Sequence, residues 1–228
     1  MGKEMKRYIA SDFHNGNGVA DYDRVLAFLD LVDDDADEFL ILGDWEELLF
    51  SNMTILTEVE PYSSVTEKVR EIARKKPVNL ILGNHDWPQG LFASSIEPIS
   101  IIPPFAEDGV YFTHGHEYDW MSFFVGTPVD PIWWRKTFPI LPLHLLLFFA
   151  SRTWEKAQDI YNMGVTIIHE RARAYAAEHG YHTVILGHTH FPTDEVRGGI
   201  RLVNTGDMLD SYSHIVQTDD VIELKFFQ

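Results

Sequence analysis

The stretch Val78-Asn79-Leu80-Ile81-Leu82-Gly83-Asn84-His85-Asp86 sets a pattern that recurs along the chain. An almost continuous apolar run of this length, ended by a turn residue, predicts a strand that is buried on both faces. The glycine that follows allows the backbone to turn sharply. Asn84 and His85 then come directly after the strand. The stretch therefore predicts a core strand whose carboxyl end presents oxygen and nitrogen donors.

Four other stretches have the same form, in which a short apolar run leads into Asp or His residues. They carry the motifs Asp12-Phe13-His14, Gly43-Asp44-Trp45-Glu46-Glu47, His114-Gly115-His116 and Gly187-His188-Thr189-His190, and Asn204-Thr205-Gly206 is a weaker sixth motif. One such motif alone is common turn chemistry. Their fixed order at the ends of predicted strands indicates one shared site. Asp, Asn and His offer the donors that suit manganese, zinc or iron.

The first half of the chain alternates between strands and helices. Strands are expected over residues 8–11, 39–42 and 78–82, with helices over 21–32 and 64–75 between them. This rhythm predicts parallel strands joined by right-handed crossovers. Because ligands collect at the carboxyl ends of parallel strands, Asp12, Asp44 and Asn84 should lie together. In the second half we expect strands over 110–113 and 183–186, a helix over 151–179 that ends at Gly180, and hairpins over 196–203 and 213–227.

The motifs together resemble those of the calcineurin-like metallophosphoesterases, and the resemblance runs over nearly the whole chain. Gly-Asn-His-Asp at 83–86 and Gly-His-Thr-His at 187–190 are its most specific parts. The resemblance implies an α/β fold, a two-layer β-sandwich flanked by helices, as a single domain over residues 1–228. Within the family, the chain looks nearest to the UDP-2,3-diacylglucosamine pyrophosphohydrolase branch. Gly-Asp-x-x-Glu at 43–47 and an apolar insertion after His114 point to it, whereas His85 and His116 stand where that branch usually has Arg and Asp.

Carried over residue by residue, the resemblance implies a centre with two divalent metal ions, manganese first and zinc or iron as alternatives. Two ions about 3.5–4 Å apart can clamp a hydroxide and a phosphoryl oxygen together, and they lower the pKa of bound water toward neutrality. A metal-bound hydroxide would then be the nucleophile. In this scheme Asp12, His14 and His190 bind the first ion, Asn84, His114 and His188 bind the second, and Asp44 bridges them.

The same resemblance makes His85 the group that protonates the leaving oxygen or stabilises the pentavalent phosphorus. Glu47 stands where the family has the carboxylate that orients this histidine, and it is one methylene longer than the usual Asp. His116 could contact substrate or support His114 from behind. The remaining histidines, which we expect to be structural or at the surface, are His144, His169, His179, His182 and His214.

Residues 118–161 differ from the rest of the chain, because they are rich in Trp and Phe and include an apolar run over 140–150. The run is interrupted by Pro142 and is too short to span a bilayer. We expect a helical insertion, either packed on the domain or acting as a cap that holds an apolar substrate or meets a membrane surface. Arg135 and Arg152 could bind a substrate phosphate or simply extend past the apolar surface.

Composition narrows the choice of function. The chain has 228 residues, a net charge of −17 and no cysteine. A strongly negative protein repels phosphate backbones, so no specific nucleic acid is expected as a partner. The absence of cysteine and of an apolar leader fits a cytoplasmic protein. The sequence therefore favours a phosphoester or pyrophosphate hydrolase that acts on a phosphorylated small molecule or a lipid-like, nucleotide-linked substrate. The alternatives are a soluble phosphodiesterase or phosphatase and a non-catalytic scaffold; the oligomeric state stays open.

Overall fold

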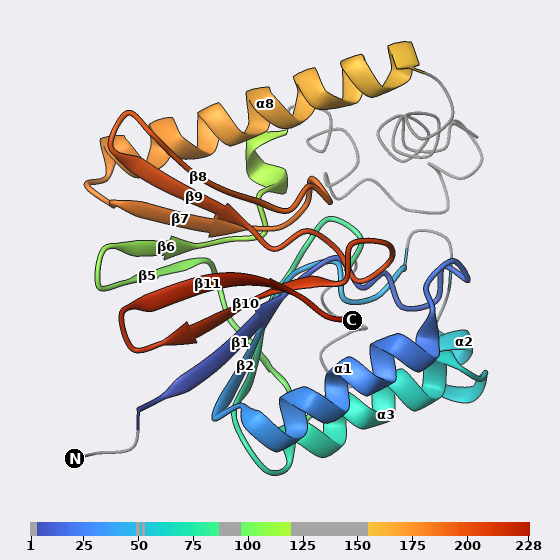
Figure 1. Cartoon of the computed structure of the whole chain (residues 1–228). Coiled ribbons are helices and arrows are strands. Elements are labelled where there is room, and N and C mark those ends of the chain that lie inside the picture. Colours follow the sequence, from blue (N-terminus) through green and yellow to red (C-terminus); the bar gives the residue numbers. More distant parts are fainter. Residues whose placement is uncertain (1–3, 49–50, 52, 87–96, 120–154) are drawn as a thin grey trace.

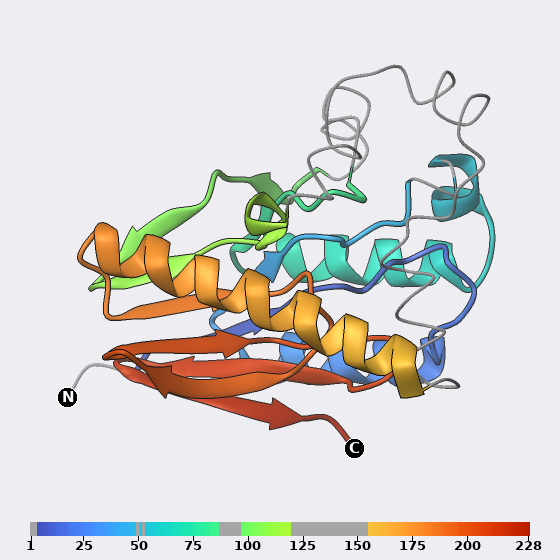
Figure 2. The same cartoon turned by 90° about the horizontal axis from the view of Figure 1, so that it is seen from above.

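The computed structural model describes residues 4–48, 51, 53–86, 97–119 and 155–228. Its elements lie in four layers, with two sheets in the middle and helices on both outer sides (Figure 1). Helices α1 (Tyr22–Asp35) and α3 (Tyr62–Ala73) cover the first sheet, and α8 (Glu155–Glu178) covers the second. Figure 2 shows α8 lying along the strands of the second sheet. The predicted α/β sandwich flanked by helices is therefore confirmed.

The first sheet has the strand order β11-β10-β1-β2-β3-β4 within the described residues. Strands β1 to β4 run parallel, and β10 and β11 add an antiparallel hairpin beside β1. The parallel arrangement predicted from the strand–helix alternation is confirmed. The strands are β1 (Lys6–Ala10), β2 (Glu38–Leu42), β3 (Val78–Ile81), β4 (Ser100–Ile101), β10 (Ser213–Thr218) and β11 (Val221–Phe226).

The second sheet has the order β5-β6-β7-β9-β8, again within the described residues. Its three central strands β6, β7 and β9 are parallel, while β5 and β8 pair antiparallel at the edges. The predicted hairpin turn at Gly198 and Gly199 joins β8 to β9. The strands are β5 (Phe105–Glu107), β6 (Val110–Phe112), β7 (Thr183–Leu186), β8 (Thr193–Arg197) and β9 (Ile200–Asn204).

The core explains why the apolar runs are continuous rather than alternating. Successive side chains of a strand point to opposite faces, and here both faces are covered. Tyr8 and Ala10 of β1 pack against the helices of the first layer, whereas Ile9 packs between the two sheets. On β7, Val184 faces α8 and Ile185 faces the first sheet. Each of these strands therefore contributes side chains to two cores.

The helix boundaries follow local signals, with some corrections. Asp21 caps α1 by accepting a hydrogen bond from the backbone N–H of Arg24, as predicted. Helix α3 begins two residues earlier than expected, directly after Pro61. The short helix α2 (Met53–Glu58) and the 3₁₀ turn η1 (His116–Tyr118) were not predicted. Residues 120–154 of the expected insertion lie outside the described residues. None of the described helices is long and apolar enough to cross a membrane.

Candidate metal centre

The loops that leave the carboxyl ends of the parallel strands meet at one place, and they carry all seven predicted metal ligands. A left-handed backbone is uncommon for a non-glycine residue and costs free energy, so it concentrates where function requires it. Five of the seven ligands adopt it, which marks this edge of both sheets as a functional site. These are Asp12 (φ 54°), His14 (φ 45°), Asp44 (φ 50°), His188 (φ 65°) and His190 (φ 54°).

The loops after β1 and β2 are hydrogen-bonded to each other. The N–H of Asp12 donates to the carbonyl of Gly43 at 3.0 Å, and the N–H of His14 donates to the carbonyl of Asp44 at 2.9 Å. The N–H of Glu47 then donates to the carbonyl of Asn15 at 2.9 Å. The parallel pairing of β1 and β2 thus continues beyond the strands. It fixes the loop of Asp12 and His14 relative to the loop of Asp44 and Glu47.

Asp12, His14 and His190 form the first cluster, as predicted. The Nε2 atoms of His14 and His190 lie 3.2 Å apart. Oδ1 of Asp12 lies 3.2 Å from Nε2 of His190 and 3.9 Å from Nε2 of His14. Its other oxygen, Oδ2, accepts the N–H of His188 at 2.9 Å. One carboxylate oxygen and two imidazole nitrogens therefore converge on a common point.

Asp44, His114 and His188 form the second cluster. Oδ2 of Asp44 lies 3.4 Å from Nε2 of His114 and 3.7 Å from Nε2 of His14, so it stands between the two clusters. Asn84 joins them, because its Oδ1 lies 3.3 Å from Nε2 of His114. Nδ1 of His114 donates to the carbonyl of Leu42 at 2.6 Å, which leaves Nε2 as the nitrogen facing Asp44. The side chain of Asp44 therefore lies near histidines of both clusters.

Glu47 contacts two histidines at once. Its carboxylate lies 2.9 Å from Nδ1 of His14 and 2.9 Å from Nδ1 of His85. Nε2 of His85 is thereby turned toward the metal-binding cluster, 4.0 Å from Oδ2 of Asp44. The predicted pairing of Glu47 with His85 is present, and the link from Glu47 to His14 was not predicted. A carboxylate behind a ligating histidine orients its ring and raises its basicity.

The electrostatics of the metal-free cluster are dominated by buried carboxylates. Burial opposes ionisation, yet the histidines outweigh it and lower the pKa of Asp12 to about 2 and that of Glu47 to about 2. Burial raises the pKa of Asp44, but the neighbouring histidines, His114 above all, hold that pKa well below its usual range. Conversely, burial lowers the pKa of His85, but the carboxylates of Glu47 and Asp44 outweigh this effect and raise that pKa to about 9. Such a cluster requires positive charge, which protons or metal ions can supply.

The residues present fit divalent metal ions. Carboxylate, amide and imidazole donors are the set that these ions accept. Oδ1 of Asp12 is buried and accepts no hydrogen bond from the described residues. A Cβ at Gly83 would lie 2.1 Å from Oδ1 of Asp44, and one at Gly187 would lie 2.1 Å from Oγ of Ser11. Glycine at these two positions lets the loops close around the ligands.

Asp86 and Asn204 hold the site together, although the sequence suggested no role for either side chain. The carboxylate of Asp86 accepts the N–H groups of Gly83 at 2.8 Å, Asp44 at 2.7 Å and Glu46 at 3.0 Å. The amide of Asn204 donates to the carbonyl of Gly187 at 2.7 Å and to Oγ1 of Thr189 at 3.0 Å. The available signals in the sequence were that Asp86 is the fourth residue of the motif at 83–86 and that Asn204 is the first residue of the weaker sixth motif.

The structure gives less information on the three candidate substrate-binding residues, His116, Arg135 and Arg152. His116 stands at the start of η1, 3.7 Å from Glu117 and next to the ring of His114. Burial and the neighbouring His114 lower the pKa of His116 to about 4, so the imidazole is neutral at pH 7 in the metal-free chain. Arg135 and Arg152 lie outside the described residues. The roles of all three stay predictions.

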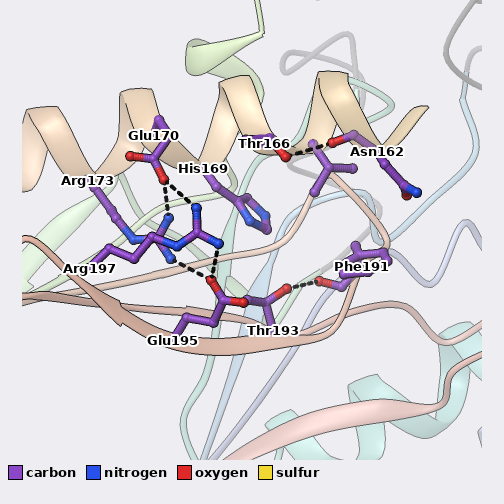
Figure 3. Close-up of a pocket in the computed structure, with 10 residues that line it drawn as sticks. Asn162, Thr166, His169, Glu170, Arg173, Phe191, Thr193, Glu195 and Arg197 are labelled. Carbon is purple, nitrogen blue, oxygen red and sulfur yellow. Dashed lines mark hydrogen bonds and ion pairs between the residues drawn. The ribbon is translucent and has the colours of Figure 1, made fainter. Parts of the chain in front are cut away.

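A separate cavity of about 190 Å³ lies between α8 and β8 (Figure 3). Its charged groups pair with one another. The guanidinium of Arg173 lies 2.9 Å from Glu170 and 3.5 Å from Glu195, and that of Arg197 contacts the same two carboxylates. Since these charges cancel, the cavity offers no clear attraction for a phosphate.

His169 lines this cavity and connects it to the metal-binding loop. Its Nε2 lies 3.2 Å from Oγ1 of Thr189, the residue between His188 and His190. The hydroxyl of Tyr161 also donates to the carbonyl of Thr189. Burial, helped by Arg173, lowers the pKa of His169 to about 4. The expectation that His169 is structural agrees with this position, because it supports the loop from behind.

Comparison with known proteins identifies the family. The family model of the calcineurin-like phosphoesterases matches residues 5–192, which is most of the chain. The chain therefore belongs to that family. The family is metal-dependent, in agreement with the clusters described above. The family prediction is confirmed, while the narrower resemblance to the UDP-diacylglucosamine pyrophosphohydrolase branch stays a prediction. The comparison with curated proteins gave no match.

Solved structures similar to the chain include two phosphoesterases and a nuclease. An archaeal phosphodiesterase is 13% identical, with a TM-score of 0.50, over 97% of this chain and 99% of that chain. Yfce, a phosphoesterase from E. coli, is 19% identical, with a TM-score of 0.49, over 98% of this chain and 100% of that chain. The nuclease MPE of Pseudomonas putida is 14% identical, with a TM-score of 0.46, over 96% of this chain and 87% of that chain. The likeness to the archaeal phosphodiesterase bears on the fold alone.

Proposed function

We propose that this chain hydrolyses phosphoester or pyrophosphate bonds with two divalent metal ions, manganese first, held by the candidate centre. The convergence of seven side chains from five motifs, with Asp44 between the two clusters, is the observation that supports this most. When bound, the ions would polarise the phosphoryl group and bring the pKa of a water molecule toward neutrality. The chain's own part is to hold them: Asp12, His14 and His190 on one side, Asn84, His114 and His188 on the other, and Asp44 between.

His85 would supply the proton for the leaving oxygen. Its ring is held at Nδ1 by Glu47, and its Nε2 faces the cluster at 4.0 Å from Asp44. The backbone N–H of His85 also donates to Oδ1 of Asp44 at 2.8 Å, so the loop that carries the acid is bonded directly to the shared ligand. General acid catalysis of this kind contributes about 10²- to 10⁴-fold. An intact acid and an intact ligand set favour an enzyme over a non-catalytic scaffold.

For the substrate, we propose an amphiphilic molecule, a phosphate-bearing or nucleotide-linked lipid, as in the pyrophosphohydrolase branch. The composition of residues 118–161 supports this, and α8 adds a second observation. Ile160, Met163 and Ile167 lie three and four residues apart on α8 and are 49%, 60% and 41% exposed. Side chains at this spacing share one helix face. An exposed apolar stripe directly after an apolar insertion favours contact with acyl chains or a membrane surface.

The test is a hydrolysis assay of the chain after metal removal and reloading with manganese, zinc or iron. The substrates are a nitrophenyl phosphate monoester, a nitrophenyl phosphodiester and a UDP-linked diacylglucosamine. We expect activity to depend on the added metal and kcat/KM to be highest for the lipid-linked pyrophosphate. A higher value for the nitrophenyl diester would favour a soluble phosphodiesterase. Turnover no greater than that of Asp44→Ala on all three substrates would favour the scaffold.

A further inference from the structure

Asp119 lies directly against His188, although it belongs to none of the motifs that carry the predicted ligands. Its Oδ2 is 3.2 Å from Nε2 of His188, and the two side chains are 10% and 2% exposed. The turn η1 delivers it there. That turn begins after Gly115, whose φ of 111° suits glycine, and it ends on Asp119, whose N–H donates to the carbonyl of His116 at 3.1 Å.

We propose that Asp119 is a positioning residue for the second metal ion, because it holds His188 in the tautomer that directs Nδ1 to that ion. This inference rests on the proposed function, in which His188 is a ligand. A carboxylate accepts hydrogen bonds, so the proton of the neutral His188 ring belongs on Nε2, and the lone pair is then on Nδ1. A carboxylate behind a ligating imidazole fixes its orientation and strengthens the metal–nitrogen bond.

Two of the other three proposed histidine ligands, His14 and His114, make this assignment specific. His14 and His114 are both bonded through Nδ1, to Glu47 at 2.9 Å and to the carbonyl of Leu42 at 2.6 Å. Each therefore presents Nε2 to the cluster. His188 is bonded through the opposite nitrogen and presents Nδ1. The structure thus assigns two tautomers within one centre, and Asp119 accounts for the exception.

The first test reads these tautomers in the metal-free chain. Long-range proton–nitrogen correlation spectra distinguish a ring protonated on Nδ1 from one protonated on Nε2. For the neutral His188 ring we expect the proton on Nε2. In Asp119→Ala the neutral ring should lose this preference. A neutral His188 ring with its proton on Nδ1 in the unmodified chain would overturn the proposal without any reference to activity.

The second test measures binding of manganese or zinc alone by titration calorimetry. Asp119→Ala should weaken one of the two equivalents of metal by about 10- to 100-fold and leave the other near normal. Asp119→Asn should recover most of the affinity, because its amide oxygen still accepts the Nε2 proton. Glu117→Gln is the matched control: Glu117 lies in the same turn and the substitution removes the same charge, but its carboxylate bonds Thr113 and the N–H of Gly115.

Melting of each metal-free variant, followed by circular dichroism, separates metal loss from unfolding, and Asp119→Asn carries the comparison if the alanine variant does not fold. Equal affinity for both ions in Asp119→Ala and the unmodified chain would overturn the proposal. So would a loss in Glu117→Gln as large as that in Asp119→Ala. An unmodified chain that binds no second ion would instead count against the proposed function.

Discussion

The two halves of the molecule build the metal centre in different ways. The first half, through residue 86, supplies Asp12, His14, the proposed shared carboxylate Asp44 and the proposed amide ligand Asn84. Its loops after β1 and β2 are joined by backbone hydrogen bonds, from the N–H of Asp12 to Gly43 at 3.0 Å and from the N–H of His14 to Asp44 at 2.9 Å. The second half supplies the three imidazoles of His114, His188 and His190, and these contact side chains and carbonyls from distant parts of the chain. His188, for example, is 69 residues from its partner Asp119.

This difference predicts which substitutions should disturb the candidate centre most. Hydrogen bonds between backbone groups of the two loops do not depend on side chains, so a single side-chain change leaves most of them in place. A side-chain partner from elsewhere in the chain is lost completely when it is replaced. We therefore expect substitutions at the shared carboxylate to affect both halves, and substitutions at supporting residues to affect one ion or one chemical step.

The largest effect should come from Asp44→Ala, because Asp44 stands where the two halves meet. We expect activity to fall to background and metal content to drop at both positions, as measured by elemental analysis of the dialysed protein. The shared carboxylate is lost to both clusters at once, at 3.4 Å from His114 and 3.7 Å from His14. Asp159→Ala, an exposed change on α8, is the charge control and should change neither quantity. Two tightly bound ions in Asp44→Ala would show that Asp44 does not bridge.

His85→Ala should separate chemistry from metal binding within the first half. We expect a loss of about 10²- to 10⁴-fold in kcat, because a general acid is removed, with metal content near normal. The loss should shrink for substrates with good leaving groups, which need no proton. Steady-state kinetics over a series of nitrophenyl and alkyl esters measure this. His179→Ala, a surface change, serves as control, and an equal loss for good and poor leaving groups would remove the acid role.

Glu47 should show an intermediate effect, because it supports one ligand and the acid together. Glu47→Gln removes the charge but keeps the length, and Glu47→Asp keeps the charge but shortens the reach to Nδ1 of both His14 and His85. For each variant we expect a loss of about 10- to 100-fold in affinity for one ion, measured by calorimetry, in addition to slower turnover. Glu58→Gln, on an exposed part of α2, is the control. Normal metal affinity in both variants would restrict Glu47 to the acid.

The smallest effect concerns a histidine that belongs to the fold and not to the site. Burial, assisted by Lys225, lowers the pKa of His214 to about 4, the opposite direction from His85. An unfolded histidine has a pKa near 6.5, so the unfolded state binds the proton first as the pH falls. His214 therefore costs stability progressively from about pH 6.5 down to about pH 4, at most about 1.4 kcal/mol per pH unit.

His214→Phe should flatten this part of the profile. The ring of His214 stacks on that of Tyr8, with ring centroids 5.6 Å apart, and its centroid lies 4.9 Å from that of Phe28. A phenyl ring should therefore keep similar contacts. Urea unfolding of the metal-free chain at pH 7 and pH 5 should show a smaller difference in unfolding free energy than in the unmodified protein. His179→Phe, at an exposed position, is the control. An unchanged difference for His214→Phe would mean that His214 is protonated in the folded state.

The parts of the site that the sequence predicted share one property, which is that local signals define them. An apolar run, a turn and a polar donor stand side by side in Val78 to Asn84, so both the strand and the position of the donor follow from neighbouring residues. The same holds for Asp12 after β1 and His188 after β7. The supports Asp119 and His169 have no such signal, because their partners lie far away along the chain.

The sequence by itself determined the order of the central strands and long helices, though not α2, η1, β4 or β5, together with the parallel first sheet, the family and the seven donors whose side chains converge. These follow from hydrophobic periodicity and from donors at strand ends, which are properties of short segments. Only the tertiary structure decided which ring nitrogen each histidine presents, that Glu47 serves both His14 and His85, and that Asp119 stands behind His188. Such pairings depend on two sheets meeting at one edge, and a contact across that edge leaves no trace in the local pattern of either segment.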